Sequence, residues 1–120
     1  VVPLYLKKNA ISTDFYVRLC DVAADGRSLN VTDGFVRLTG SAAEMNRRQE
    51  VRISFWPTAY EFAPGHRLRL QIASAAHPRW NRNLGTAEPA TIGTSMCRSE
   101  QQIHHDRHAP SQLWLPVWLD

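Results

Sequence analysis

The segment 65–83 constrains the fold of this chain more than any other part of its sequence. After a glycine turn, Leu68, Leu70 and Ile72 alternate with arginine and glutamine residues. Such strict alternation is typical of a β-strand with one buried and one exposed face. A polar loop that contains His77 and Trp80 follows at once. We therefore expect a half-buried antiparallel strand that carries a polar loop to one edge of a β-sandwich.

The rest of the chain predicts further short strands. No helical period is convincing, and the alternation of apolar and polar residues predicts strands at 2–6, 15–22, 29–38, 51–56, 101–105 and 112–119, with a short extra segment at 60–62. A chain of 120 residues is long enough for one core. We therefore expect a single all-β domain, an antiparallel β-sandwich with Greek-key or jelly-roll connections.

Two Asp-Gly pairs and one proline refine these strand predictions. Asp25 and Gly26 predict the turn of a hairpin, whereas Asp33 and Gly34 lie inside a predicted strand and indicate either a bulge or a break. Pro116 favours an edge position or a bulge for the last strand. The connection from 77 to 99 is too long to be routine, so we expect it to be functional or packed by a partner.

The charge and composition argue against several classes of partner. The net charge is +3, but its basic residues are interleaved with acidic ones, which does not favour nucleic-acid binding. No apolar run approaches the roughly 20 residues of a membrane span, and no signal peptide is recognisable. The two cysteines, Cys20 and Cys97, are expected to be reduced. We expect a cytoplasmic protein without a cofactor, although secretion of a longer parent stays open.

The motifs give no reason to expect a catalytic or metal centre. The chain lacks a G-x-S-x-G nucleophile elbow, a P-loop and a C-x-x-C pair. His104, His105, Asp106 and His108 form a cluster of metal-ligating residue types. Zinc ligands at this spacing are typical of a helix, and the flanking residues here do not follow a helical pattern. We accordingly predict that this chain contains no catalytic residue and no metal ligand.

Two sets of residues are candidates for binding and for structure. Indoles and arginines suit contact with a protein surface, and stacking on a sugar is the alternative. The candidates for a domain interface or binding surface are Trp80, Arg79, His77, Trp56, Trp114 and Trp118. Carboxylates at strand ends and turns, and polar side chains in a long loop, favour an internal network. The candidates for that structural polar network are Asp21, Asp33, Arg82 and Asn83.

An ordered set of segments resembles a known family. The segments are 13–22, 25–28, 31–37, 64–70, 78–83 and 105–117. Together they resemble the C-terminal non-catalytic domain of the superfamily of X-Pro dipeptidyl-peptidases, cocaine esterases and α-amino-acid ester hydrolases. The resemblance implies a jelly roll of the galactose-binding-like type. It also implies an upstream α/β-hydrolase domain that carries a Ser-His-Asp triad.

The resemblance also implies a role. The domain would pack on the α/β-hydrolase domain of its own parent chain, its expected partner, and would help to shape the substrate pocket. Residues 1–6 read like a strand entered part-way, so we expect the chain to lack the first strand or two of the family domain. An aromatic surface left without its partner would favour homo-oligomers. The alternative from another class is an independent carbohydrate-binding module that uses the exposed tryptophans.

Overall fold

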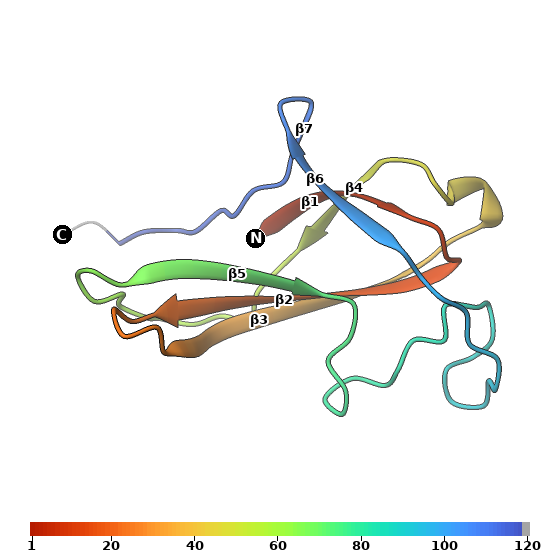
Figure 1. Ribbon diagram of the computed structural model, residues 1–120, viewed down its shortest axis with the longest axis horizontal. Helices are drawn as coiled ribbons and strands as arrows, with labels where there is room; N and C mark the ends of the chain where they lie inside the picture. Colours follow the sequence, from red (N-terminus) through yellow and green to blue (C-terminus); the bar gives the residue numbers. More distant parts are fainter. Residues whose placement is uncertain (119–120) are drawn as a thin grey trace.

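The computed structural model describes residues 1–118 as two antiparallel β-sheets packed face to face (Figure 1). The first sheet has the order β4-β1-β6-β7, and the second has the order β3-β2-β5. The strands are β1 (Val2–Lys8), β2 (Ser12–Val22), β3 (Ser28–Thr39), β4 (Gln49–Ile53), β5 (Arg67–Ala73), β6 (Gln101–Asp106) and β7 (Ala109–Pro110), with one short 3-10 helix, η1 (Ala42–Glu44). The prediction of an all-β antiparallel sandwich is confirmed.

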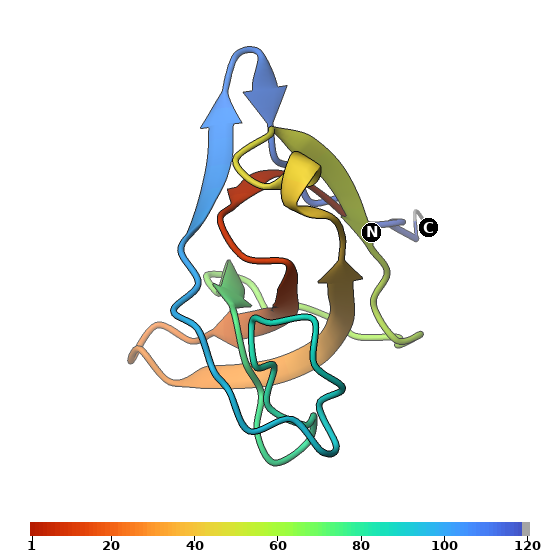
Figure 2. The same ribbon diagram turned by 90° about the vertical axis from the view of Figure 1, so that its right-hand side faces the viewer.

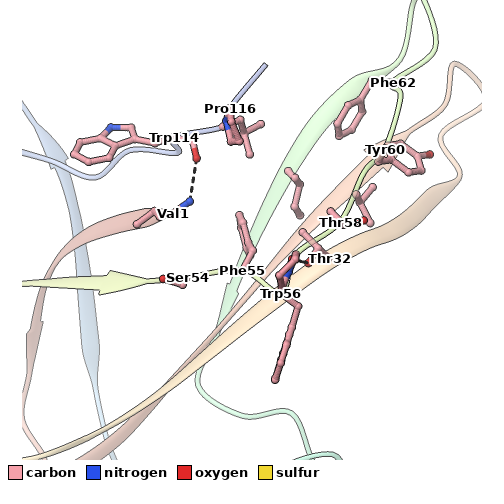
Figure 3. Close-up of a pocket in the computed structure, with 14 residues that line it drawn as sticks. Val1, Thr32, Ser54, Phe55, Trp56, Thr58, Tyr60, Phe62, Trp114 and Pro116 are labelled. Carbon is pink, nitrogen blue, oxygen red and sulfur yellow. Dashed lines mark hydrogen bonds between the residues drawn. The ribbon is translucent and has the colours of Figure 1, made fainter. Parts of the chain in front are cut away.

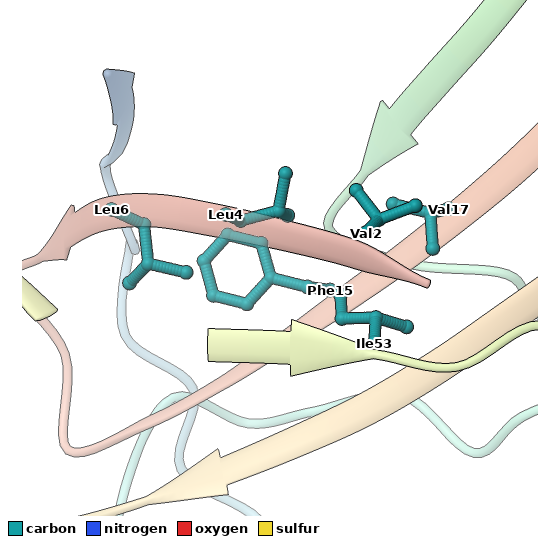
Figure 4. Close-up of a cluster of buried hydrophobic side chains, with 6 residues drawn as sticks. All are labelled: Val2, Leu4, Leu6, Phe15, Val17 and Ile53. Carbon is teal, nitrogen blue, oxygen red and sulfur yellow. The ribbon is translucent and has the colours of Figure 1, made fainter. Parts of the chain in front are cut away.

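The core lies between β1 and the inward face of β2 (Figure 4). Alternate residues of β1 point into it, because successive side chains of a strand lie on opposite faces. Phe15 is the largest fully buried side chain of the cluster. The buried cluster consists of Val2, Leu4, Leu6, Phe15, Val17 and Ile53. This small core holds the two sheets together.

The β2–β3 hairpin contains the turn that the sequence predicts. Asp25 Oδ1 accepts the backbone N–H of Arg27 at 3.0 Å, and Ala23 N–H donates to the Arg27 carbonyl at 2.9 Å. Gly26 has a φ of +88°, a conformation that costs glycine little and other residues more. The Asp25-Gly26 prediction is therefore confirmed.

The second Asp-Gly pair does not break its strand. β3 runs continuously through Asp33 and Gly34, and the irregularity of the hairpin lies nearby, opposite the step from Leu19 to Cys20. Gly34 is needed for a different reason, because a methyl group there would overlap the Ser54 carbonyl. The chain after β4 crosses the outer edge of β3 at this point, and Trp56 N–H donates to the Asp33 carbonyl at 3.0 Å.

Two predicted strands are wrong over the residues that can be compared. Residues 112–118 form no regular strand, and Leu119 lies outside the described residues. Gln112 and Trp114 do donate backbone bonds to the carbonyls of Pro3 and Val1, at 3.0 and 2.8 Å. Pro116 has no N–H with which to continue this pattern. Residues 60–62 likewise form no strand, and Tyr60 is fixed instead by the bond that its hydroxyl donates to Asp21.

Candidate interaction surface

An apolar cleft of about 260 Å³ opens between the two sheets at one end of the sandwich (Figure 3). Residues from both termini and from the connection between β4 and β5 line it. The apolar residues of its lining include Leu19, Val31, Phe55, Trp56, Tyr60, Phe62, Trp114 and Pro116. Such a concentration of aromatic rings offers a large apolar contact area.

Backbone bonds between the chain ends build one wall of the cleft. Val1 N donates to the Trp114 carbonyl at 2.9 Å, and Trp114 N–H donates to the Val1 carbonyl at 2.8 Å. Trp114 Nε1 donates to Gln112 Oε1 at 2.8 Å, and the Arg52 guanidinium lies 5.4 Å from the centre of its ring. The indole of Trp114 is therefore held in a defined position although it is half exposed.

The aromatic residues of this region are more exposed than residues of their type usually are. Trp56 is 61% exposed and Trp114 is 48% exposed, and Tyr60 and Trp118 are exposed as well. Trp56 and Trp114 come from different segments, and Figure 3 shows their indole rings pointing away from each other. Exposed apolar side chains that gather around one cleft commonly mark a contact with another protein or a ligand. We call Trp56, Tyr60, Phe62 and Trp114 the aromatic face.

A buried carboxylate anchors the second wall of the cleft. Asp21 is 3% exposed and accepts the Tyr60 hydroxyl at 2.7 Å. His66 Nδ1 lies 2.9 Å from Asp21 Oδ1. The hydrogen bond from His66, followed by the one from Tyr60, holds the pKa of Asp21 below its ordinary value, against the effect of desolvation. The bond to Asp21 in turn raises the pKa of the Tyr60 hydroxyl.

This anchor predicts an acid-dependent loss of stability. The pKa of Asp21 in the folded chain is lower than the usual 3.8, so ionised Asp21 stabilises the fold above pH 3.8. That contribution is lost as the pH falls from 3.8 through the lowered value in the folded chain. We expect Asp21→Asn to lower the free energy of unfolding at pH 7 and to flatten its fall between pH 5 and 2. Urea unfolding at several pH values measures both, and an equally steep fall in the variant would contradict the assignment.

A second polar cluster lies on the outer face of the β2–β3 pair. Asp14 is buried and accepts two bonds from Arg37, at 2.7 Å from Nε and 2.8 Å from Nη2. Asn83 Nδ2 donates to Asp14 Oδ1 at 2.6 Å and to Ser12 Oγ at 2.9 Å. Arg37 Nη2 also donates to the Asn81 carbonyl at 2.8 Å. The cluster therefore fastens the loop after β5 to the sheet, and the bond to Asp14 raises the pKa of Arg37.

A third cluster fastens the same loop further along. Asp33 is buried and accepts the Tyr16 hydroxyl at 2.8 Å and a short bond from Arg79. Trp80 stacks on Phe35, with the ring centres 4.3 Å apart and the planes 6° from parallel. Residues 79–83 thus cover part of the outer face of the sheet.

The structure distributes the predicted candidates over different places. Trp56 and Trp114 lie on the aromatic face, Trp118 is almost fully exposed, and His77 is exposed in the loop after β5. Arg79 and Trp80, expected at an interface, contact Asp33 and Phe35 of the same chain. Asp21, Asp33 and Asn83 make internal hydrogen bonds. Arg82 is exposed, and the arginine that binds the buried carboxylate of Asp14 is Arg37.

Sequence reasoning missed several partners in these clusters. Arg37, Tyr16 and His66 were not singled out, although each contacts a buried carboxylate. The signal for Arg37 is its register, since it lies directly opposite Asp14 across the hairpin. The bulge between Leu19 and Cys20 shifts the register beyond that point, so counting from the turn alone does not find the pair.

No group of three or more His, Cys, Asp and Glu side chains in residues 1–118 is arranged to hold a metal ion. In the histidine cluster, His104 Nδ1 lies 3.9 Å from Asp106 Oδ2, and the other carboxylate oxygen, Asp106 Oδ1, accepts the backbone N–H of His108 at 2.8 Å. Within the same range, no helix combines the length and apolar character needed to cross a membrane.

Comparison with known proteins gives two matches. Residues 1–114 match the family described as the X-Pro dipeptidyl-peptidase C-terminal non-catalytic domain. The chain is also 32% identical, over 123 residues, to a protein named cocaine esterase from Rhodococcus sp. (strain MB1 Bresler). That alignment covers 95% of this chain and 21% of the relative, so the chain spans about a fifth of the length of the curated relative that it matches.

Proposed function

Because the chain belongs to the family of X-Pro dipeptidyl-peptidase C-terminal non-catalytic domains, we propose that it serves a serine hydrolase as a docking and pocket-forming domain. In this proposal the aromatic face packs against the α/β-hydrolase domain of the same polypeptide. Acyl transfer through a Ser-His-Asp triad takes place in that other domain. The substrate class is an ester, an amide or an X-Pro peptide.

The exposed aromatic face is the observation that carries this proposal. Asp21 holds the ring of Tyr60 on one wall, and the backbone bonds between Val1 and Trp114 hold Trp114 on the other. These rings are therefore preorganised for contact with a partner. Burying exposed aromatic rings is favourable, at about 25 cal/mol per Å² of apolar surface. Large aromatic residues are also enriched in the buried centres of protein interfaces.

Footprinting with hydroxyl radicals tests the docking step in the full-length enzyme. We expect Trp56 and Trp114 to be oxidised slowly there, because the catalytic domain covers them. Met96 provides an internal control, since it is exposed in the long loop, away from the aromatic face. Rapid oxidation of Trp56 and Trp114 alongside Met96 would contradict docking through this face.

A serine-directed fluorophosphonate probe tests where the chemistry takes place. We expect the full-length enzyme to be labelled at a serine outside these 120 residues and the label to abolish hydrolysis of ester substrates. Peptide mapping by mass spectrometry locates the modified residue. Labelling of a serine within this chain would show that the domain itself carries a nucleophile.

Kinetics of the full-length enzyme separate pocket formation from docking alone. If the aromatic face contributes to the substrate pocket, Trp56→Ala raises KM for a bulky acyl group more than for a small one. A docking role alone would lower thermal stability and leave the ratio of the two KM values unchanged. Saturable quenching of tryptophan fluorescence by a simple or polymeric sugar would instead favour a carbohydrate-binding module.

A further inference from the structure

Arginine side chains gather on the outer face of the β2–β5 pair. Arg67 and Arg69 are alternate residues of β5, so both side chains lie on the face that points away from the core. On the neighbouring strand β2, Arg18 lies opposite Gln71, and Cys20 lies opposite Arg69. Arg18 is therefore the diagonal neighbour of Arg69, and such positions are about 7–8 Å apart. We call Arg18, Arg67 and Arg69 the arginine face.

The described part of the chain does not neutralise this face. Within residues 1–118, none of its three arginines forms an ion pair with an Asp or Glu side chain. Asp33 lies opposite Arg18 across the hairpin, but its carboxylate is already bound by Arg79 and Tyr16. Residues 62–87, which include β5 and much of the loop after it, contain no Asp or Glu. Like charges on neighbouring positions of a sheet repel each other, so an acidic partner would relieve a cost that the domain carries alone.

One cation of this face is held in a defined position. Arg18 Nε donates to the Tyr16 hydroxyl at 3.3 Å, and the guanidinium carbon lies 5.3 Å from the centre of the Tyr16 ring. A hollow of about 420 Å³ lies beside Arg18, with Ala73, Ala75 and Ala76 in its lining. These small side chains leave room for a carboxylate next to the terminal nitrogens of the guanidinium. Arginine commonly binds a carboxylate through two parallel hydrogen bonds.

The loop after β5 leaves the arginine face open. Residues 79–83 are fastened over β3, where Trp80 stacks on Phe35. Figure 1 and Figure 2 show this loop on the side of the sheet that faces away from the other sheet, near the end of β5. The beginning of β5 extends well beyond the loop in Figure 1. Arg67 and Arg69 are accordingly exposed.

The spacing of the arginines matches an extended acidic peptide. Side chains two residues apart in a strand repeat about every 6.6 Å. A peptide with acidic residues at alternate positions therefore presents carboxylates at the same repeat as Arg67 and Arg69. A single-stranded nucleic acid also presents regularly spaced anions, but its binding proteins commonly stack bases on exposed aromatic rings. The residues beside the arginines here are Cys20 and Gln71, and the ring of Tyr16 is buried, which favours the peptide.

A second copy of this chain does not supply such a peptide. No two of its acidic residues lie two positions apart in the sequence. Exposed acidic residues that already form ion pairs with arginine are Asp25, Glu50 and Glu100. The catalytic domain, in the proposed docking, covers the cleft between the sheets and not the outer face of this sheet. The acidic segment is therefore expected to come from a different protein.

We propose that the arginine face binds an extended acidic segment of a second, different protein, with alternate carboxylates paired to Arg67, Arg69 and Arg18. The inference goes beyond the proposed function, because the domain then recruits a partner as well as docking on its catalytic domain. The aromatic face contains none of these arginines, so the two interactions use different side chains. Binding at the arginine face is measured without substrate and does not depend on hydrolase activity.

Two synthetic peptides of equal composition and charge test this proposal with the full-length enzyme. In the first, glutamate and threonine alternate. In the second, pairs of glutamates alternate with pairs of threonines, so no two glutamates lie two positions apart. By fluorescence anisotropy we expect the alternating peptide to bind at least about threefold more tightly, with an affinity that falls as salt is added. Equal affinities, or tighter binding of a single-stranded oligonucleotide of the same charge, would overturn the proposal.

A matched pair of substitutions locates the binding. Arg69 belongs to the arginine face, whereas Arg98 is exposed elsewhere and paired with Glu100. We expect Arg69→Gln to weaken binding of the alternating peptide by about threefold to fivefold and Arg98→Gln to leave it unchanged. Equal effects of the two variants would overturn the proposal.

Thermal unfolding of the full-length enzyme without peptide provides the second measurement. We expect Arg69→Gln to leave the midpoint unchanged or to raise it, because the variant removes a repulsion between like charges. A lowered midpoint would overturn the proposal, because it would show that Arg69 already has an acidic partner within the enzyme.

Discussion

Replacing Asp14 by alanine is expected to lower the free energy of unfolding by about 3 kcal/mol, because one buried carboxylate then leaves two partners behind. Arg37 loses both of its bonds to the carboxylate, and Asn83 loses its bond of 2.6 Å. The residue is 3% exposed, so water cannot readily replace these contacts. Urea unfolding of the wild-type chain and the variant measures the difference.

An exposed ion pair gives the control for Asp14. Arg98 Nη2 lies 2.9 Å from Glu100 Oε1, but both side chains are largely in solvent. We expect Glu100→Ala to change the unfolding free energy little, because surface ion pairs contribute little. Similar effects of Asp14→Ala and Glu100→Ala would show that burial does not strengthen the Asp14 cluster. Fast proteolysis near residues 79–83 in Asp14→Ala alone would show that the cluster holds the loop.

Replacing Phe15 by alanine is expected to destabilise the fold by about 4 kcal/mol, the largest effect that we predict. Phe15 is the largest fully buried side chain and packs between β1 and β2 (Figure 4). Its removal leaves a cavity in a core that has few other large residues, so the surrounding side chains cannot fill the space. Thermal unfolding followed by circular dichroism measures the loss.

Two variants define what would contradict the Phe15 prediction. Phe15→Leu retains most of the buried volume, so we expect a smaller loss than for alanine. Phe62→Ala removes a ring from the half-buried wall of the cleft and should also cost less. A loss for Phe62→Ala that equals or exceeds the loss for Phe15→Ala would place the main core at the cleft.

The sequence predicts the strands well because their alternation records which face is buried. The patterns around Leu4, Phe15 and Leu70 each locate a strand, and Asp25 with Gly26 locates the hairpin turn. The pattern fails at 112–118, where apolar alternation continues but Pro116 lacks the backbone donor that a strand needs. Residue pattern alone therefore overestimates the length of β-structure near prolines.

The polar clusters are harder to predict because they depend on register and on loop conformation. Asp14 meets Arg37 across a hairpin that contains a bulge, and the sequence does not reveal where the bulge lies. The stacking of Trp80 on Phe35 likewise depends on the conformation of the loop, which the sequence does not reveal. Trp56 and Trp114 alternate with aliphatic residues along the sequence, and this pattern can be read without knowing how the strands pair.

The loop that covers β2 and β3 makes the two outer faces of the sandwich different. Residues 79–83 lie on the outer face of this sheet and are bonded there through Arg37, Asn83 and Arg79, so part of the sandwich has three layers instead of two. This third layer already occupies the surface that a neighbouring domain would otherwise use. In the proposed docking, the neighbouring domain therefore approaches at the cleft, and residues 79–83 limit the orientations in which the two domains can meet.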